Sequence, residues 1–204
     1  MSDNLKAKTR QLRRDHILDS AIKVFDAQGF RGATIHAIAQ SAGVSDGTVY
    51  NVFENKEDIL LAVLHRLLQS SLQGAPVPPP NMTLDHMLRR MIAARWDGMT
   101  PEVLAMMRVV WSEALINREL ASQYCETILA PVFAAPEPMF QHLLEQGELA
   151  DTDIPMTIRT MAATFIGFTM LKLLGDPLVN ERSADVPAQL AEILLAGLKP
   201  GAQP

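Results

Sequence analysis

Residues 34–56 read TIHAIAQSAGVSDGTVYNVFENK, and apolar residues recur through this stretch at the spacing of short helices. Thr34 is a good N-cap residue, so we expect a first helix to begin directly after it. Ser45 can cap a second helix, in which Val49 and Phe53 lie four residues apart and face inward. Two short helices joined by a tight, glycine-containing turn have the size and spacing of a helix-turn-helix.

The second of these helices would present a small, hydrogen-bonding outer face, formed by Asp46, Gly47, Thr48, Tyr50 and Asn51. In a helix-turn-helix, such a face enters the major groove of DNA while the first helix crosses the backbone. The free N–H groups at the helix N-termini after Thr34 and Ser45 are suited to phosphate binding. The alternative is a small helical bundle whose outer residues are simply polar.

A longer string of residues at fixed spacings decides between these alternatives. It comprises Ile17, Leu18, Asp19, Ser20, Ala21, Phe25, Gly29, Thr34, Ile38, Ala39, Ala42, Gly43, Val44, Ser45, Gly47, Thr48, Val49, Tyr50, Phe53, Lys56 and Glu57. The string runs without a gap and resembles the TetR family of transcriptional regulators. The resemblance implies an all-α homodimer with an N-terminal helix-turn-helix DNA-binding domain, here 1–56, and a larger helical ligand-binding and dimerisation domain, here 57–204.

The resemblance also implies roles for individual residues. The expected DNA-binding residues are Thr34, Ser45, Gly47, Thr48, Tyr50, Asn51 and Lys56. Tyr50 and Lys56 resemble the family's phosphate contacts, whereas Thr48 and Asn51 resemble its base readers. Val52 departs from the family pattern, because a histidine, tyrosine or other large polar residue usually stands at this position.

Charge agrees with DNA binding without requiring it. The formal net charge is -5, yet basic side chains outnumber acidic ones within residues 1–56. A basic end can approach a polyanion, because the field of distant charges is screened within about 8–10 Å. The same pattern would suit an ordinary solvated helix.

Composition and hydropathy indicate where the protein works. The N-terminus lacks the apolar core of a signal peptide, and the most apolar stretch, 161–174, is short for a membrane span and contains Lys172. One cysteine, Cys125, allows no internal disulfide. We therefore expect a soluble cytoplasmic protein that does not enter a membrane.

Other motifs carry less weight. The sequence GVSDG at 43–47 fits the nucleophile elbow of hydrolases, but that elbow needs a strand before the serine, and a helix is expected here. An enzyme that uses Ser45 is nevertheless the rival from another functional class. The five histidines lack the spacing of metal ligands. We expect no enzymatic activity, no metal site and no cofactor.

The C-terminal part is predicted to be helical throughout, since no alternating strand pattern occurs. The proline-rich segment 74–81 is the clearest boundary in the sequence. Beyond it, helices should begin after Thr83 and Thr100, and Pro131 should kink or end another helix near Ile128.

The candidate ligand-binding residues are Trp96, Met107, Arg108, Trp111 and Phe165. Methionine and aromatic side chains can line an adaptable pocket for an apolar or amphipathic small molecule, but they can equally form ordinary core. Arg108 lies among apolar residues, so burial would require a partner, either Glu113, another acid or an anionic ligand.

The apolar helix expected over 155–174 contains small residues that suit close packing. Together with the last helix, it would form a four-helix seam between two copies of the chain. We therefore predict a ligand-responsive transcriptional regulator, most simply a repressor, that binds a pseudo-palindromic double-stranded DNA operator as a homodimer and is released by a small molecule. An activator, or a helical interaction module that binds no DNA, would fit the same helices.

Overall fold

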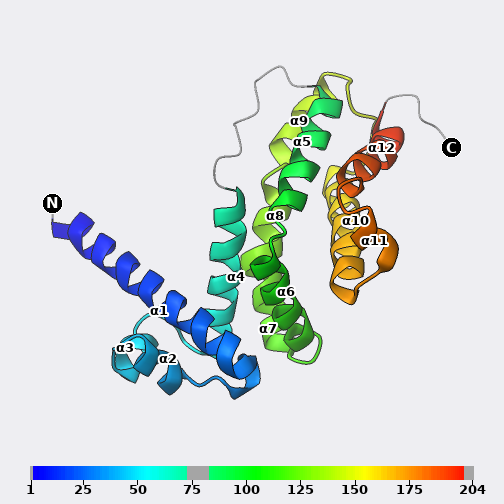
Figure 1. The fold of residues 1–204 in the computed structure, drawn as a ribbon. Helices are drawn as coiled ribbons and strands as arrows, with labels where there is room; N and C mark the ends of the chain where they lie inside the picture. The colour runs from blue at the N-terminus through cyan, green and yellow to red at the C-terminus, as the bar shows by residue number, and fades with distance from the viewer. Residues whose placement is uncertain (1, 73–82, 200–204) are drawn as a thin grey trace. The chain divides into compact units, whose positions relative to one another are not determined.

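The computed structural model describes residues 2–72 and 83–199. Every regular element in this part of the chain is a helix, which confirms the predicted all-α fold (Figure 1). The proline-rich boundary predicted at 74–81 lies outside the described residues. The chain divides into two compact units, here called unit 1 (Met1–Leu67 and Ala105–Tyr124) and unit 2 (Leu68–Leu104 and Cys125–Pro204).

Unit 1 contains the predicted helix-turn-helix. Its helices are α1 (Ser2–Gly32), α2 (Ile35–Ser41), α3 (Asp46–Tyr50), most of α4 (Lys56–Leu72), the C-terminal part of α6 (Pro101–Ala114) and α7 (Arg118–Tyr124). Each of α1 to α4 contributes fully buried apolar side chains, among them Ile17, Ile38, Val49 and Leu60. Helices as short as α2 and α3 are unstable alone, so this shared core holds them in place.

Two glycines in left-handed geometry set the turns around α2. Gly29, with φ of 67°, interrupts α1 one turn before its end, where the sequence predicts a stop. Gly43, with φ of 63°, lies in the turn between α2 and α3. A side chain would be strained at either position, so the path of the chain itself requires glycine there.

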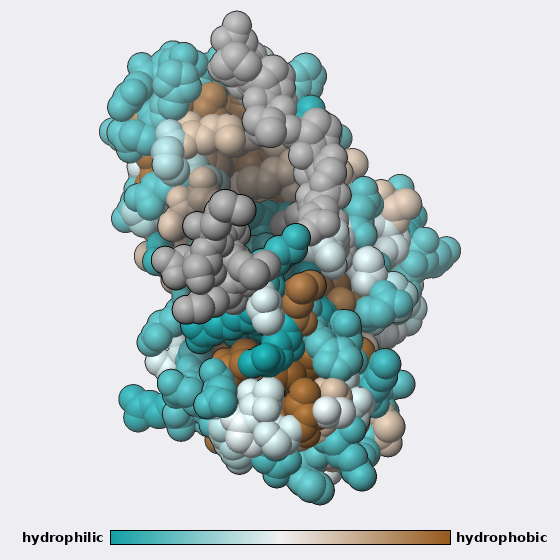
Figure 2. All heavy atoms as spheres, turned by 90° about the vertical axis from the view of Figure 1, so that its left-hand side faces the viewer, coloured by the Kyte–Doolittle hydropathy of each residue, from teal (hydrophilic) through white to brown (hydrophobic). Residues whose placement is uncertain are grey.

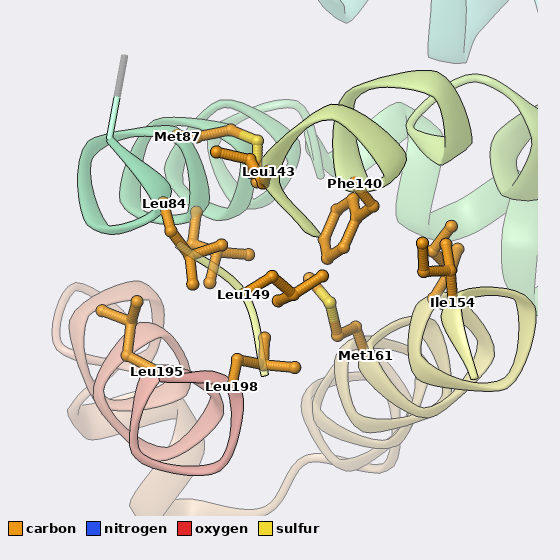
Figure 3. Close-up of a cluster of buried hydrophobic side chains, with 11 residues drawn as sticks. Leu84, Met87, Phe140, Leu143, Leu149, Ile154, Met161, Leu195 and Leu198 are labelled. Atoms are coloured by element: carbon orange, nitrogen blue, oxygen red, sulfur yellow. The ribbon is translucent and has the colours of Figure 1, made fainter. Parts of the chain in front are cut away.

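Unit 2 is a second helical core. Its helices are α5 (Leu84–Asp97), the π-helix η1 (Cys125–Leu129), α8 (Ala130–Ala134), α9 (Glu137–Glu145), α10 (Ile154–Leu174), α11 (Pro177–Glu181) and α12 (Val186–Leu198). Figure 3 shows leucine, methionine and phenylalanine side chains from α5, α9, α10 and α12 pointing toward one another. Phe140 is fully buried at this meeting point.

Pro131 distorts its helix, as predicted, but does not end it. The chain forms the π-helical turn Cys125–Leu129 and continues directly into α8. A proline inside an α-helix clashes with the carbonyl group four residues earlier. Because Pro131 occupies the first turn of α8, immediately after the wider π-turn, that clash is relieved.

Helix α10 corrects one prediction about the membrane. It begins at Ile154, where the carboxylate of Asp153 accepts a hydrogen bond of 3.0 Å from the Met156 N–H group. The helix is therefore long enough and apolar enough to cross a membrane by length and composition, contrary to the estimate from 161–174. Only 22% of its most apolar window is buried within the chain.

The two units do not coincide with the predicted domains. Residues 105–124 group with the N-terminal helices, whereas the sequence places them in the C-terminal domain. The units are groups of residues in contact, whereas the predicted domains divide the chain by function. The predicted domain boundary after residue 56 therefore stays a prediction.

Candidate nucleic-acid interface

Side-chain caps fix the N-termini of α2 and α3, as the sequence predicts. Thr34 Oγ1 accepts a 3.1 Å hydrogen bond from the Ala37 N–H group, and Ser45 Oγ accepts one of 3.2 Å from the Thr48 N–H group. The hydroxyl groups of Ser45 and Thr48 also bond to each other at 2.9 Å. The start of α3 is therefore held rigidly in relation to the turn before it.

The outer face of α3 is open to solvent. Val49 is fully buried, whereas the side chain of Tyr50 is 58% exposed and Asn51 is exposed beside it. A Cβ atom added at Gly47 would meet only Ser45 Oγ, at 3.9 Å, so no neighbour in the chain requires glycine there. An external partner could approach this backbone closely. Figure 2 shows hydrophilic side chains over much of the face that α1, α2 and α3 present.

One acidic residue on this face has a partner that sequence reasoning missed. The imidazole of His36, on α2, lies 3.2 Å from the Asp46 carboxylate at the start of α3. The Asp46 carboxylate would repel a phosphate, and the imidazole beside it is its partner within the chain. The spacing of ten residues gives no helical signal, so only the folded turn brings the pair together.

Lys56 has a structural role in addition to the predicted phosphate contact. Its ammonium group donates hydrogen bonds to the carbonyl oxygens of Phe30, at 2.8 Å, and Ala33, at 3.0 Å. It also lies 4.4 Å from the centroid of the Phe30 ring. Lys56 therefore joins the start of α4 to the end of α1, and its contact with DNA stays a prediction.

The candidate ligand-binding residues fall into both units. In unit 2, Trp96 packs edge-on against Phe165 with 5.9 Å between ring centroids, and its indole N–H donates to the Ser183 carbonyl group at 2.8 Å. In unit 1, the indole N–H of Trp111 donates to the Tyr124 hydroxyl group at 3.0 Å. The remaining two are the buried Met107 and the exposed Arg108, both in unit 1. A common cavity therefore stays a prediction.

Arg108 is exposed, so the burial that would have required a partner does not occur. It lies on the solvent side of α6, while the suggested partner Glu113 accepts a 2.8 Å hydrogen bond from Arg31. The Glu113 side chain is 16% exposed and that of Arg31 is 73% exposed. This pair joins the end of α1 to α6 within unit 1.

A different arginine is partly withdrawn from solvent. Arg95 follows Leu88 and Ile92 on the inner face of α5, and burial lowers the pKa of its guanidinium group from the usual value. No hydrogen bond or ion pair to Arg95 is formed within residues 2–72 and 83–199. Arg95 lies seven residues after Leu88, a spacing that puts both on one face of a helix. This spacing could have identified Arg95, rather than Arg108, as the arginine on a buried face.

The interpretation of Ser45 as a hydrolase nucleophile requires a strand before the serine, and the structure has a helix there. The residue before the turn belongs to helix α2, and the described part of the chain contains no strand. Ser45 Oγ is engaged in capping α3. No group of three or more potential metal ligands occurs among the described residues.

Comparisons with known proteins agree with this geometry. Residues 17–63 match the family described as "Bacterial regulatory proteins, tetR family". The HTH-type transcriptional regulator HbdR of Aromatoleum sp. (strain CIB) is 37% identical over 84 residues, which cover 41% of this chain and 36% of HbdR. The chain spans less than two thirds of the length of the first curated relatives that it matches.

Solved structures extend the likeness beyond the matched segment. A TetR-family transcriptional regulator from Mesorhizobium loti gives a TM-score of 0.70 at 20% identity, covering 93% of this chain and 98% of that one. FadR of Bacillus subtilis in complex with stearoyl-CoA gives 0.66 at 21% identity, covering 89% and 97%. These identities support the fold alone, whereas the match at 17–63 is one of sequence. Residues 17–63 therefore carry sequence of the TetR family of bacterial regulatory proteins, and the fold of the chain is similar to that of TetR-family regulators.

Proposed function

We propose that this protein is a ligand-responsive transcriptional repressor that binds a pseudo-palindromic DNA operator as a homodimer and is released by a small molecule. The observation that carries the proposal is the geometry of α3. Its inner side is locked by the fully buried Val49 and the cap at Ser45, while Thr48, Tyr50 and Asn51 lie on the outer side. This is the arrangement by which a recognition helix enters the major groove.

The exposed apolar surface of α10 and α12 supports a homodimer. Met156 and Leu174 on α10 are 60% and 76% exposed, and Ile193 on α12 is 63% exposed. A second copy would cover such surface by a symmetric four-helix seam. The membrane is the less favourable alternative, because α10 contains the charged residues Arg159 and Lys172.

The proposed effector is an apolar or amphipathic molecule. The aromatic side chains of Trp96 and Phe165 in unit 2 would contact its apolar part, and the half-buried Arg95, in the same unit, supports a ligand that also carries an anionic group. The FadR structure with stearoyl-CoA shows that the same fold accepts such a molecule in another protein. The ligand would favour a dimer whose recognition helices no longer match successive major grooves, about 34 Å apart.

Operator binding is the first test. An operator selected from random duplexes should be bound specifically, and Asn51→Ala should relax the preference at particular base pairs by about 1–3 kcal/mol. Thr48→Ala should do the same at different positions. Arg182→Ala, an exposed change in unit 2, serves as the control and should leave the preference unchanged. Equal affinity of the wild-type protein for every duplex would contradict the proposal.

Ligand release is the second test. A thermal-shift screen of amphipathic molecules should give a hit that raises the Tm, by the equivalent of about 2.7 kcal/mol at a hundredfold excess over its Kd. The same molecule should weaken operator binding, since coupling between sites is reciprocal. Trp96→Ala, in unit 2, should reduce this effect and preserve operator affinity without ligand. A hit that strengthens operator binding would contradict release, and transcription assays would then distinguish an activator.

A further inference from the structure

The N-terminal half of α1 is a strongly basic surface that the expected DNA contacts do not include. Between residues 7 and 14 the described side chains include Lys8, Arg10, Arg13 and Arg14 and no acid. Within unit 1, this half of α1 extends beyond α2 and α3 (Figure 1). Its charge is therefore presented to whatever partner α3 meets.

This half-helix forms a notch beside the recognition helix. A cavity of about 410 Å³ is lined by Ala7, Arg10, Gln11, Arg14 and Val52. Val52 directly follows Asn51, the C-cap residue of α3, so the notch lies at the end of the helix that carries the expected base readers.

The charged groups that line the notch are two guanidinium groups, which donate hydrogen bonds. Arg14 is half-buried, and its guanidinium group lies 4.5 Å from the centroid of the Phe53 ring, which orients it. Arg10 is exposed, and neither arginine forms an ion pair within the described residues. The Gln11 amide group donates a hydrogen bond to the Asp15 carboxylate at 3.2 Å. Two guanidinium groups without carboxylate partners favour an anion.

We propose that the notch binds a backbone phosphate of the operator, through Arg10 and Arg14. The inference rests on the proposed DNA-binding function. The valine side chain at position 52 cannot donate a hydrogen bond. Arg10 and Arg14 line the same notch from α1, so their guanidinium groups are the donors that it offers to a phosphate.

The salt dependence of DNA binding tests this assignment. The full-length protein is titrated with its selected operator and with a random duplex over a series of KCl concentrations. Arg10→Ala should make the plot of log affinity against log salt less steep, and the double variant with Arg14→Gln, which removes both contacts to the one phosphate, should reduce its steepness by about 0.9 in total. The ranking of operator sequences should not change, because phosphates carry no base identity.

Two matched variants make the result specific to the notch. Lys23→Ala removes one exposed charge from the same helix outside the notch, and it should leave the slope unchanged. Adding Val52→Lys to Arg10→Ala returns a cation to the notch and should restore the slope. Measurement of the Tm of each variant separates loss of contact from loss of folding, which matters for Arg14 because it packs on Phe53.

The outcomes separate this inference from the proposed function. Folded Arg10 and Arg14 variants with the wild-type slope would overturn the notch while leaving operator recognition intact. An equal loss in Lys23→Ala would also overturn it, since net charge alone would explain the effect. A wild-type protein that discriminates no operator would overturn the proposed function and the notch with it.

Discussion

The helix-turn-helix part of unit 1 (α1 to α4), here called the head, and unit 2 differ in how consistently their helices begin with a side-chain cap. In the head, Thr34, Ser45 and Asn55 each accept a hydrogen bond from a backbone N–H group three residues later. In unit 2, helices α8, α9 and α12 begin without a side-chain cap and have proline in the first turn. The other unit 2 helices α5, α10 and α11 do have side-chain caps, from Thr83, Asp153 and Asp176. Side-chain caps thus fix the starts of α2, α3 and α4 in the head, whereas unit 2 combines capped helices with helices that begin at a proline alone.

The largest expected effect comes from removing one aromatic side chain from each region. Phe53→Ala and Phe140→Ala each empty a nearly or fully buried site, so each should lower the free energy of unfolding by about 3–5 kcal/mol. Urea denaturation measures this loss. At low temperature, Phe53→Ala should also abolish specific operator binding, while Phe140→Ala should retain it. Equal losses of binding would show that the two regions are not separately specified.

Lys56 gives the next largest effect. Lys56→Ala removes two hydrogen bonds from a charged donor to carbonyl groups, so it should cost about 1.5–3 kcal/mol of stability. It should also lower the salt slope of DNA binding by about 0.9 if the predicted phosphate contact forms. Thermal denaturation and operator titration measure the two effects independently. Lost stability with an unchanged slope would leave Lys56 with the structural role alone.

A cap variant sharpens the comparison further. Ser45→Ala should destabilise the protein by about 1 kcal/mol and weaken operator binding, because the cap also orients Thr48. Asp176→Ala removes a comparable cap from α11 in unit 2, where the carboxylate bonds to the Val179 N–H group. It should cost similar stability without affecting operator binding. A matching loss of operator affinity in Asp176→Ala would contradict the division drawn here.

The smallest effect is expected for the pair that joins α1 to α6. Because Arg31 is largely exposed, Arg31→Ala should cost only about 0.2–1 kcal/mol of stability. The informative measurement is the release of DNA from the Arg31→Ala variant by an identified effector. An unchanged ability of an identified effector to release DNA would show that this ion pair does not couple α6 to the head.

The sequence predicted most of the head because its signals are local. The caps at Thr34 and Ser45, the break at Gly29 and the inward side of Val49 all follow from spacings of a few residues. The partner of Lys56 did not follow, since carbonyl groups carry no sequence identity. The exposure of Arg108 did not follow either, because an almost continuously apolar helix gives a weak periodic signal.

The π-turn at Cys125–Leu129 has a consequence for the length of the chain. Such a turn takes up one residue more than an α-helical turn while the helix on either side continues. A deletion of one residue within it, combined with replacement of Pro131 by a residue that has an N–H group, would leave α7 and α8 with their present faces, so Tyr124 and Phe133 would keep their surroundings. The head cannot lose a residue in this way, because each capping side chain bonds to the backbone N–H group three residues later. Single-residue insertions and deletions among relatives should therefore collect at this turn and be absent from residues 34–56.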